Sequence, residues 1–221
     1  MTVAPDEVSL LVPVKAFDQA KFRLAPHVDP SERQRLARAM ATHVVSVAAP
    51  LPVAIVCDDD NVAEWCASVG ARLIWTPGTG LNGAVQQGVD VLGELGFRRV
   101  IVAHSDLPLA ANFSELASWS GVTLVPDRHR MGSNVVAVPT DAGFRFSYGT
   151  GSYSRHIAEA VRVGRGIRVV HQERLAWDVD FPTDLNFPAN LAPRSGSPVA
   201  ELAGHVVADH SDSQPQGSTD S

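Results

Sequence analysis

The most constraining feature of the sequence is the regular return of short apolar runs with amphipathic segments between them. The runs are rich in Val and Ile and are bounded by Pro, Gly or Asp, which is typical of buried strands: residues 9–14, 53–57, 71–75, 99–105 and 121–126. The segments between them have helical periodicity and end near glycine or small residues: residues 31–49, 59–70 and 81–96. This alternation predicts an α/β sandwich with a mainly parallel sheet.

The pattern becomes less regular after Pro126. Two further runs, 133–139 and 167–173, predict strands on either side of a helix at 152–164. No linker-like stretch separates the two parts, so we expect a single domain over residues 1–189, with halves of about 1–126 and 127–189. Residues 190–221 are polar and rich in Ser, Pro and Asp, and we expect them to be disordered.

Composition narrows the classes of function. The chain has 221 residues and a formal net charge of -6, which argues against a nucleic-acid or anionic-membrane partner. Its two cysteines, Cys57 and Cys66, form no disulfide framework or zinc motif and suit a reducing compartment. The N-terminus has no signal-peptide pattern and no apolar run is long enough to span a bilayer. We therefore expect a cytoplasmic protein.

A glycine-rich stretch, "TPGTGLNGAV" at 76–85, matches the spacing G-x-G-x-x-G of dinucleotide-binding turns. Asp106 even follows at a suitable distance. In a dinucleotide fold, however, this turn joins the first strand to its helix, whereas here it follows the third predicted strand and contains Thr76-Pro77. The spacing is therefore weak evidence for a nicotinamide cofactor. A P-loop is excluded because no Gly-Lys-Ser or Gly-Lys-Thr follows.

A cationic loop follows the first predicted strand. In "VPVKAFDQAKFRLAP", residues 12–26, Lys15, Lys21 and Arg23 lie close together before the first helix. Ligands of open α/β sheets bind beyond the carboxyl ends of the strands, where these cations could offset the charge of a triphosphate. A solvated basic loop is the alternative.

Carboxylates occupy two similar places. Asp106 in "HSDLPL" ends a predicted strand, where it could bind a metal–nucleotide complex or cap the next turn. In "WDVDFPTDL", Asp178 and Asp180 alternate along an extended segment, an arrangement that suits Mg²⁺ but also a charged surface turn. We expect Asp184 to face water or to cap the turn after Pro182.

Other catalytic constellations have little support. The histidines have no metal-ligand spacing and are expected to be structural or on the surface: His104, His129, His156 and His171. Ser105 lacks the G-x-S-x-G context of a hydrolase nucleophile. The basic loop, the glycine turn and the aspartates together favour metal-assisted nucleotidyl transfer.

Six motifs occur in order over residues 12–185: "VPVKxxxxAKxRLAP", "GxGLNxA", "DLPL", "PDRHxxGxN", "FxYGxxSxxRH" and "DVDxPxDL". In this ordered set the chain resembles the CofC/FbiD family, the guanylyltransferases of coenzyme F-420 biosynthesis. The resemblance implies a three-layer α/β/α nucleotide-diphospho-sugar transferase (Rossmann-like) fold with a mixed, mainly parallel sheet. The first half would then bind the nucleotide, and the second half the acceptor.

The resemblance also implies an activity. Members of this family transfer GMP from GTP to the phosphate of a three-carbon acid and release pyrophosphate. The acid is phosphoenolpyruvate in actinobacterial members, 2-phospho-L-lactate in archaeal ones and 3-phosphoglycerate in some others. The Ala- and Arg-rich composition resembles that of actinobacterial proteins, so the resemblance implies phosphoenolpyruvate here. Because the product is labile, functional coupling to the downstream transferase that consumes it is expected.

The site residues implied by the resemblance fall into four groups. The residues expected to hold the triphosphate and assist catalysis, the last of them also a metal ligand, are Lys15, Lys21, Arg23 and Asp106. Those expected at the nucleoside are Gly80, Leu81 and Asn82. Those expected to bind Mg²⁺, with two ions, are Asp106, Asp178 and Asp180. Those expected to bind the acceptor's carboxylate and phosphate are Ser133, Gly149 and Ser152.

Some positions depart from the family pattern. Phe22 and Phe181 stand where small or hydroxylated residues are usual, and they could narrow the acceptor pocket. Ser133 replaces a usual threonine, and His104-Ser105 replaces smaller, more apolar residues. Two alternatives remain open: a sugar-phosphate or molybdopterin nucleotidyltransferase, and a diverged, non-catalytic nucleotide-binding paralogue.

Overall fold

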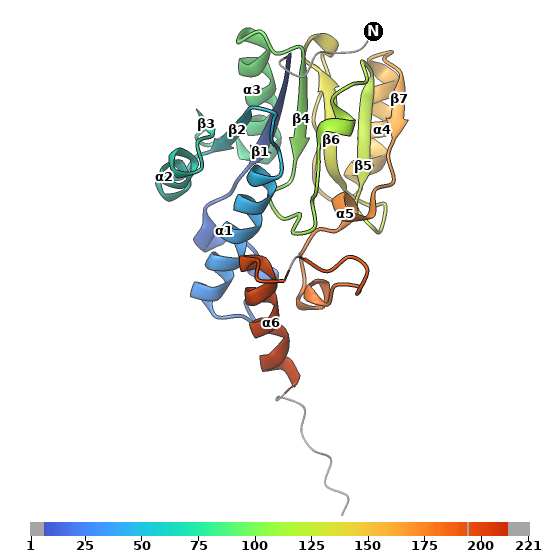
Figure 1. Ribbon diagram of the computed structural model, residues 1–221. Helices are drawn as coiled ribbons and strands as arrows, with labels where there is room; N and C mark the ends of the chain where they lie inside the picture. Colours follow the sequence, from blue (N-terminus) through green and yellow to red (C-terminus); the bar gives the residue numbers. More distant parts are fainter. Residues whose placement is uncertain (1–6, 194, 212–221) are drawn as a thin grey trace, which may run out of the picture.

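A single seven-stranded sheet forms the centre of the protein (Figure 1). The computed structural model describes residues 7–193 and 195–211. Along the sheet the strands follow the order β3-β2-β1-β4-β6-β5-β7. β6 is antiparallel to its neighbours β4 and β5, and the other strand pairs are parallel, so the mixed, mainly parallel sheet is confirmed. The strands are β1 (Val8–Pro13), β2 (Val53–Cys57), β3 (Arg72–Trp75), β4 (Arg99–Ala103), β5 (Val122–Pro126), β6 (Ser133–Pro139) and β7 (Ile167–Val169).

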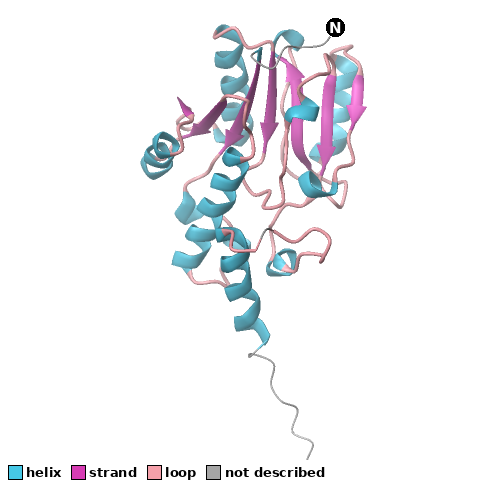
Figure 2. Cartoon of the chain, viewed as in Figure 1, coloured by secondary structure: helices cyan, strands magenta, loops and turns pink. Residues whose placement is uncertain are grey.

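Helices surround the sheet and extend below it (Figure 2). The α-helices are α1 (Pro30–Ser46), α2 (Asp60–Ser68), α3 (Gly80–Glu94), α4 (Ser152–Arg162), α5 (Glu173–Ala176) and α6 (Pro198–Ser211). Short 3₁₀ helices are η2 (Phe17–Gln19), η3 (Phe22–Leu24), η4 (Ser114–Leu116), η5 (Thr140–Ala142) and η6 (Pro182–Leu185). Among the described residues, no helix combines the length and apolarity that crossing a membrane requires.

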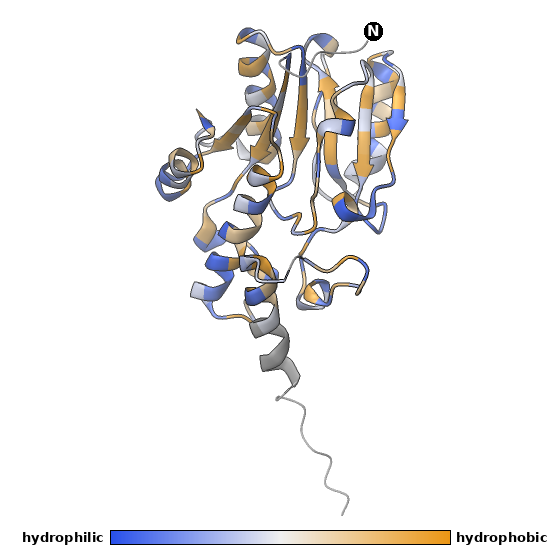
Figure 3. Cartoon of the chain, viewed as in Figure 1, coloured by the Kyte–Doolittle hydropathy of each residue, from blue (hydrophilic) through white to orange (hydrophobic). Residues whose placement is uncertain are grey.

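The two faces of the sheet bury separate apolar clusters, because alternate residues of a strand point to opposite sides. In β1, Leu10 and Val12 belong to a cluster with residues of α1 and α2. Leu11 belongs to the other cluster, with residues of α3 and α4. The strands are accordingly apolar along most of their length (Figure 3). This three-layer arrangement agrees with the predicted α/β sandwich.

α1 begins directly after an N-cap aspartate, Asp29. The Asp29 carboxylate accepts the Ser31 N–H at 2.8 Å, and Pro30 takes the first helical position, where its missing N–H costs nothing. Leu36 and Met40 are fully buried on the inner face. The helix ends at Ser46, earlier than the predicted residue 49.

α3 lies unusually close to the sheet. A Cβ atom at Gly88 would stand 2.7 Å from Leu11 and 2.7 Å from Val56, so only glycine permits this approach. The close packing fixes the start of α3, at Gly80, near the carboxyl ends of β1 and β2. The predicted glycine turn is thus the entry to a helix that follows β3.

The C-terminal segment differs from the expectation of disorder. Residues 198–211 form α6, and Val199 and Ala203 are buried against Leu36 and Met40 of α1. The prediction was wrong for this helix, because Val199, Leu202 and Ala203 form an apolar stripe that can pack on α1. Residues 212–221 lie outside the described residues.

Candidate active site

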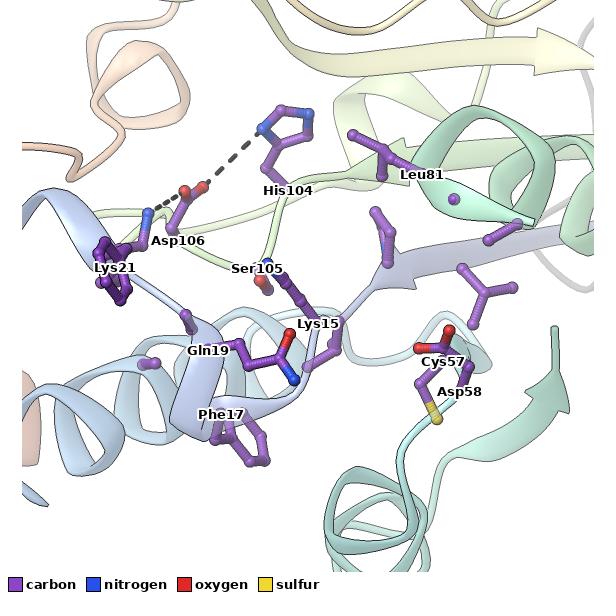
Figure 4. Close-up of a pocket in the computed structure, with 18 of the residues that line it drawn as sticks. Lys15, Phe17, Gln19, Lys21, Cys57, Asp58, Leu81, His104, Ser105 and Asp106 are labelled. Atoms are coloured by element: carbon purple, nitrogen blue, oxygen red, sulfur yellow. Dashed lines mark hydrogen bonds and ion pairs between the residues drawn. The ribbon is translucent and has the colours of Figure 1, made fainter. Parts of the chain in front are cut away.

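A cavity of about 560 Å³ lies at the carboxyl ends of the parallel strands β1, β2 and β4. Most of the residues predicted to hold the triphosphate and the nucleoside line it, together with two predicted metal ligands (Figure 4). They are Lys15, Lys21 and Arg23 from the loop after β1, Gly80 and Leu81 from α3, Asp106 from the loop after β4, and Asp180. This is the expected ligand edge of an open α/β sheet.

Lys21 lies at the centre of the charged groups. Its Nζ donates hydrogen bonds to the carboxylate of Asp106 and to the carbonyl of Val179 at 2.5 Å, and lies 3.5 Å from Asp180. Burial acts to lower the pKa of Lys21, but the charges of Asp106 and Asp180 outweigh it, so the pKa is raised. Its backbone is left-handed, with φ 54°, a strained conformation for a residue with a side chain.

Asp106 has one paired oxygen and one without a hydrogen bond. Oδ2 accepts from Lys21, whereas Oδ1 is buried, has no hydrogen-bond partner and lies 3.9 Å from Nδ1 of His104. Burial acts to raise the pKa of Asp106, but the Lys21 charge outweighs it and the pKa is lowered. The carboxylate is therefore ionised and keeps an oxygen that another group can bind.

Asp180 and Arg23 form the more exposed side of the cluster. Arg23 Nη1 donates to Asp180 Oδ2 at 2.6 Å, and the guanidinium lies over the Phe181 ring, 5.3 Å from its centroid. Phe22 is 75% exposed and lies under the guanidinium of Arg33, and Phe181 is 51% exposed. Both aromatic rings contact arginines, and their predicted effect on the acceptor pocket stays a prediction.

Asp178 has a different set of partners from Asp180. Its Oδ1 accepts from the amide of Asn134 at 3.3 Å and lies 3.7 Å from Arg128. Burial, and after it the nearby charge of Asp106, raises the pKa of Asp178. An added cation beside Asp106 and Asp178 would relieve this repulsion.

Asp184 is structural. It is buried, and its Oδ2 accepts the backbone N–H groups of Asp180 at 2.8 Å and Phe181 at 2.7 Å. Oδ1 accepts from Arg128. The prediction that Asp184 caps the turn after Pro182 is confirmed, and the alternative prediction, that its side chain faces water, is wrong. Asp184 and Arg128 together hold the segment that carries Asp178 and Asp180.

The fit of this cluster to a metal rests on its oxygen donors. Hard carboxylate oxygens suit Mg²⁺, and the buried Oδ1 of Asp106 has no hydrogen-bond partner. Within residues 7–193 and 195–211, no three His, Cys, Asp or Glu side chains are arranged to hold a metal ion, and the Lys21 ammonium lies between Asp106 and Asp180. The donor chemistry fits, and the assignment of Asp106, Asp178 and Asp180 to Mg²⁺ stays a prediction.

The three predicted acceptor residues lie together. The Ser133 N–H donates to Ser152 Oγ at 3.1 Å, and the Ser152 N–H donates to the Gly149 carbonyl at 2.9 Å. Both serines are buried, and none of the three residues is among those that line the 560 Å³ cavity. They form a separate cluster at the start of β6 and of α4.

His156 connects this cluster to the segment before α4 through two hydrogen bonds. Its Nε2 accepts the Ser147 N–H at 3.0 Å, so Nδ1 carries the proton and donates to Ser133 Oγ at 3.1 Å. Burial lowers the pKa of His156 to about 4, and the ring is neutral near pH 7. Because the Ser133 oxygen accepts this bond, its hydroxyl can still donate one hydrogen bond.

The three residues predicted to bind the nucleoside do not all line the cavity. Gly80 and Leu81 line the cavity. The side chain of Asn82 instead accepts the backbone N–H of Tyr148 at 2.6 Å, which ties α3 to the segment before α4. Asn82 therefore links the cavity wall to the acceptor cluster.

Sequence reasoning missed three residues that organise the site, Arg128, Asn134 and Tyr148, and expected the fourth, His156, only as a structural or surface histidine. Each lies within or beside a motif that carried the resemblance, "PDRHRMGSN" or "FRFSYGTGSYSRH". The sequence signal for these residues was their place in or beside these motifs. A motif does not show which groups each side chain hydrogen-bonds in the fold.

Known proteins share both the sequence pattern and the fold. A family model described as "Guanylyl transferase CofC like" matches residues 8–187. The chain belongs to this family. A phosphoenolpyruvate guanylyltransferase of Sphaerobacter thermophilus is 33% identical over 196 residues, 85% of this chain and 95% of the relative. A 2-phospho-L-lactate guanylyltransferase of Methanothermobacter thermautotrophicus is 32% identical over 183 residues, 79% of this chain and 81% of the relative.

The solved structures agree on the fold. A structure described as a nucleotide-diphospho-sugar transferase from Desulfovibrio desulfuricans G20 aligns with a TM-score of 0.76 at 18% identity, covering 96% of this chain and 100% of that one. The nucleotide-diphospho-sugar transferase type of fold is therefore confirmed. Because the family model and the named relatives are guanylyltransferases, this protein is a nucleotidyltransferase enzyme.

Proposed function

We propose that this protein transfers GMP from GTP to the phosphate of phosphoenolpyruvate, with Mg²⁺, and releases pyrophosphate as a step of coenzyme F-420 biosynthesis. The observation that carries the proposal is one cavity lined by Lys15, Lys21, Arg23 and Asp106 in a chain of the CofC-like family. The relative from S. thermophilus, named for phosphoenolpyruvate, supports this acceptor. The relative from M. thermautotrophicus keeps 2-phospho-L-lactate as the second candidate.

The reaction needs no protein nucleophile. A phosphate oxygen of the acceptor attacks the α-phosphorus of GTP, and the bond from that phosphorus to the oxygen that bridges to the β-phosphate breaks. The electron pair leaves with pyrophosphate, so the charge on the departing group grows. Lys15, Lys21 and Arg23 are the cations of the cavity that can offset this charge.

The protein's main task is to hold two anions against each other. Lys21 is fixed by Asp106 and the Val179 carbonyl, so its ammonium is oriented before any ligand arrives. Mg²⁺ held by Asp106, Asp178 and Asp180 would neutralise the attacking and departing oxygens. Arg128 and Asp184 keep the segment with Asp178 and Asp180 in place.

The test is pyrophosphate release by the full chain with GTP and Mg²⁺. Phosphoenolpyruvate, 2-phospho-L-lactate and 3-phosphoglycerate are supplied one at a time, with ATP in place of GTP as the control. We expect release with GTP and phosphoenolpyruvate that stops when Mg²⁺ is chelated. Because pyrophosphate is measured directly, a labile second product does not hide turnover.

Release with a different acid would replace phosphoenolpyruvate as the acceptor. Equal release with ATP would contradict the assignment of guanine nucleotide. No release with any of the acids, in the presence of the downstream transferase, would favour the non-catalytic paralogue.

A further inference from the structure

A buried arginine of α1 contacts the loop that carries the predicted triphosphate-binding cations. Arg33 stands near the start of α1, and only 6% of the residue is exposed. Its Nη1 donates hydrogen bonds to the carbonyl of Ala20 at 2.9 Å and, less closely, to that of Asp18 at 3.4 Å. Burying a guanidinium removes it from water at a cost, so these contacts must bring a benefit that an apolar residue would not supply.

The contacts of Arg33 lie on both sides of Lys21. The two carbonyls belong to residues just before Lys21, and the ring of Phe22, just after it, has its centroid 5.5 Å from the Arg33 guanidinium. Lys21 itself has φ 54°, in the left-handed region where a residue with a side chain is strained. Strain of this kind persists only where neighbouring groups hold the backbone, and Arg33 is such a group.

α1 gives Arg33 a fixed base. Leu36 anchors the helix with a fully buried side chain, and Ala37, one turn after Arg33, lines the cavity. The loop itself forms short turns that join near neighbours, such as the hydrogen bond from the Leu24 N–H to the Lys21 carbonyl at 2.9 Å. Arg33 therefore joins this loop to a helix that the core holds in place.

We propose that Arg33 is a positioning residue, which fixes the backbone on both sides of Lys21 so that the ammonium is in place before GTP binds. This inference rests on the proposed function, in which Lys21 holds the triphosphate. Asp106 and the Val179 carbonyl hold the ammonium, whereas Arg33 holds the backbone. Arg33 is not among the residues that line the cavity, so it acts through Lys21. Fixing a long side chain in advance lowers the entropy cost of ordering it on binding.

The first measurement tests the positioning without any ligand. Amide hydrogen exchange of the full chain is followed by mass spectrometry on peptides that cover residues 17–25. In Arg33→Met we expect this exchange to be about tenfold faster, because the loop loses its link to α1 and opens more often. Arg35→Met is the matched control and should keep the wild-type exchange, since Arg35 is exposed on the same helix and pairs with Glu32 at 3.6 Å.

The second measurement asks whether Arg33 acts through Lys21. The dissociation constant of a fluorescent GTP analogue with Mg²⁺ is measured for the wild type, Arg33→Met, Lys21→Met and the double variant. We expect Arg33→Met to weaken binding about tenfold in the wild-type background but less than about twofold in the Lys21→Met background. Arg33→Lys keeps the charge and a donor but not the planar fork, so it should recover part of the affinity. It replaces Arg33→Met in both measurements if that variant does not fold, with smaller effects in the same direction.

Equal weakening by Arg33→Met in the two backgrounds would show that Arg33 only supports the fold, and it would overturn the inference. Unchanged exchange of residues 17–25 in Arg33→Met would overturn it as well. A failure of the proposed function is recognised separately: a Lys21→Met protein that binds the analogue as the wild type does would remove the triphosphate role of Lys21, and the inference with it.

Discussion

A charged side chain stands near each end of β4, but the two differ in burial and in their hydrogen-bond partners. Arg99 starts the strand and is fully buried. Its guanidinium donates to the carbonyls of Leu116 at 3.0 Å and Gly121 at 2.6 Å, and to the Thr123 hydroxyl at 3.0 Å. Burial lowers its pKa to about 10, and neutral acceptors hold it without an opposite charge.

Asp106, just beyond the other end of β4, has a carboxylate that the fold pairs at only one of its two oxygens. One carboxylate oxygen is paired with Lys21, and the other is buried without a hydrogen bond. A charge whose partners are all supplied by the fold contributes to stability, whereas a charge with an unused oxygen is available to a ligand. We therefore expect Arg99, at the amino end of β4, to contribute mainly to stability, and Asp106, beyond the carboxyl end, to contribute mainly to activity.

The largest expected effect is on turnover, from Asp106→Asn. The amide keeps the size of the side chain but removes the negative charge beside Lys21, so pyrophosphate release should fall about a thousandfold or more. The free energy of unfolding should change by less than about 2 kcal/mol, because Lys21 retains Val179 and Asp180. Enzyme assays and urea titration measure the two quantities.

The matched control is Asp141→Asn, which removes a surface carboxylate paired with Arg165 at 3.1 Å. It should leave both quantities unchanged within error. A rate for Asp106→Asn within tenfold of wild type would contradict the role given to the carboxyl end of β4.

The second effect is on stability, from Arg99→Met. The substitution leaves the carbonyls of Leu116 and Gly121 buried without their donor and should cost roughly 3 kcal/mol of unfolding free energy. The folded fraction should keep the wild-type KM for GTP. Arg98→Met is the control, because Arg98 is an exposed neighbour with a surface ion pair to Glu7 at 3.5 Å, and it should cost less than about 1 kcal/mol. Equal losses of unfolding free energy in Arg99→Met and Arg98→Met would contradict the stabilising role given to Arg99.

The third effect is a pH dependence of stability from His156. Its pKa is about 4 in the folded protein, below the ordinary 6.5, chiefly because of burial, with smaller contributions from Arg155 and His104 that Glu159 opposes. The unfolded chain therefore binds the extra proton first, so stability is full above pH 6.5 and falls as the pH drops from 6.5 towards 4. The loss reaches about 2–3 kcal/mol.

Urea titrations of the wild type between pH 7.5 and 4.5 measure this slope. His129→Gln should keep the same profile because the His129 side chain is exposed, and His156→Gln should flatten it. A wild-type stability that stays constant from pH 6.5 to 4.5 would show that His156 is not held neutral by the fold.

Much of the fold was predictable because the strands are apolar on both faces. Runs such as 53–57 and 133–139 match β2 and β6 residue for residue. α6 was missed although Val199, Leu202 and Ala203 have helical spacing, because the surrounding polar composition dominated the interpretation.

The meeting of Lys21 and Asp106 in one cavity was predictable, because each lies in the segment that follows a strand of the parallel sheet; their roles stay predictions. Pairs that only the fold brings together were not predictable. Arg128 and Asp184 are 56 positions apart, and Ser133 and His156 are 23 apart, so no local pattern joins them. The expected Mg²⁺ ligands also have different partners: Asp178 accepts from Asn134, whereas Asp180 lies near Lys21. Asn134 and Lys21 come from distant parts of the chain, so no local pattern predicts this difference.

The reversed direction of β6 has a consequence for how this enzyme can diversify. Because β6 is antiparallel to β4 and β5, its first residues, Ser133 and Asn134, lie at the same edge as the end of β5. The short hairpin of residues 127–132 therefore opens onto the acceptor side, braced by the Asp127 carboxylate, which accepts three of its backbone N–H groups. We therefore expect changes within this connection to alter the neighbouring cluster of Ser133, Gly149 and Ser152 without disturbing the pairing of β4, β5 and β6.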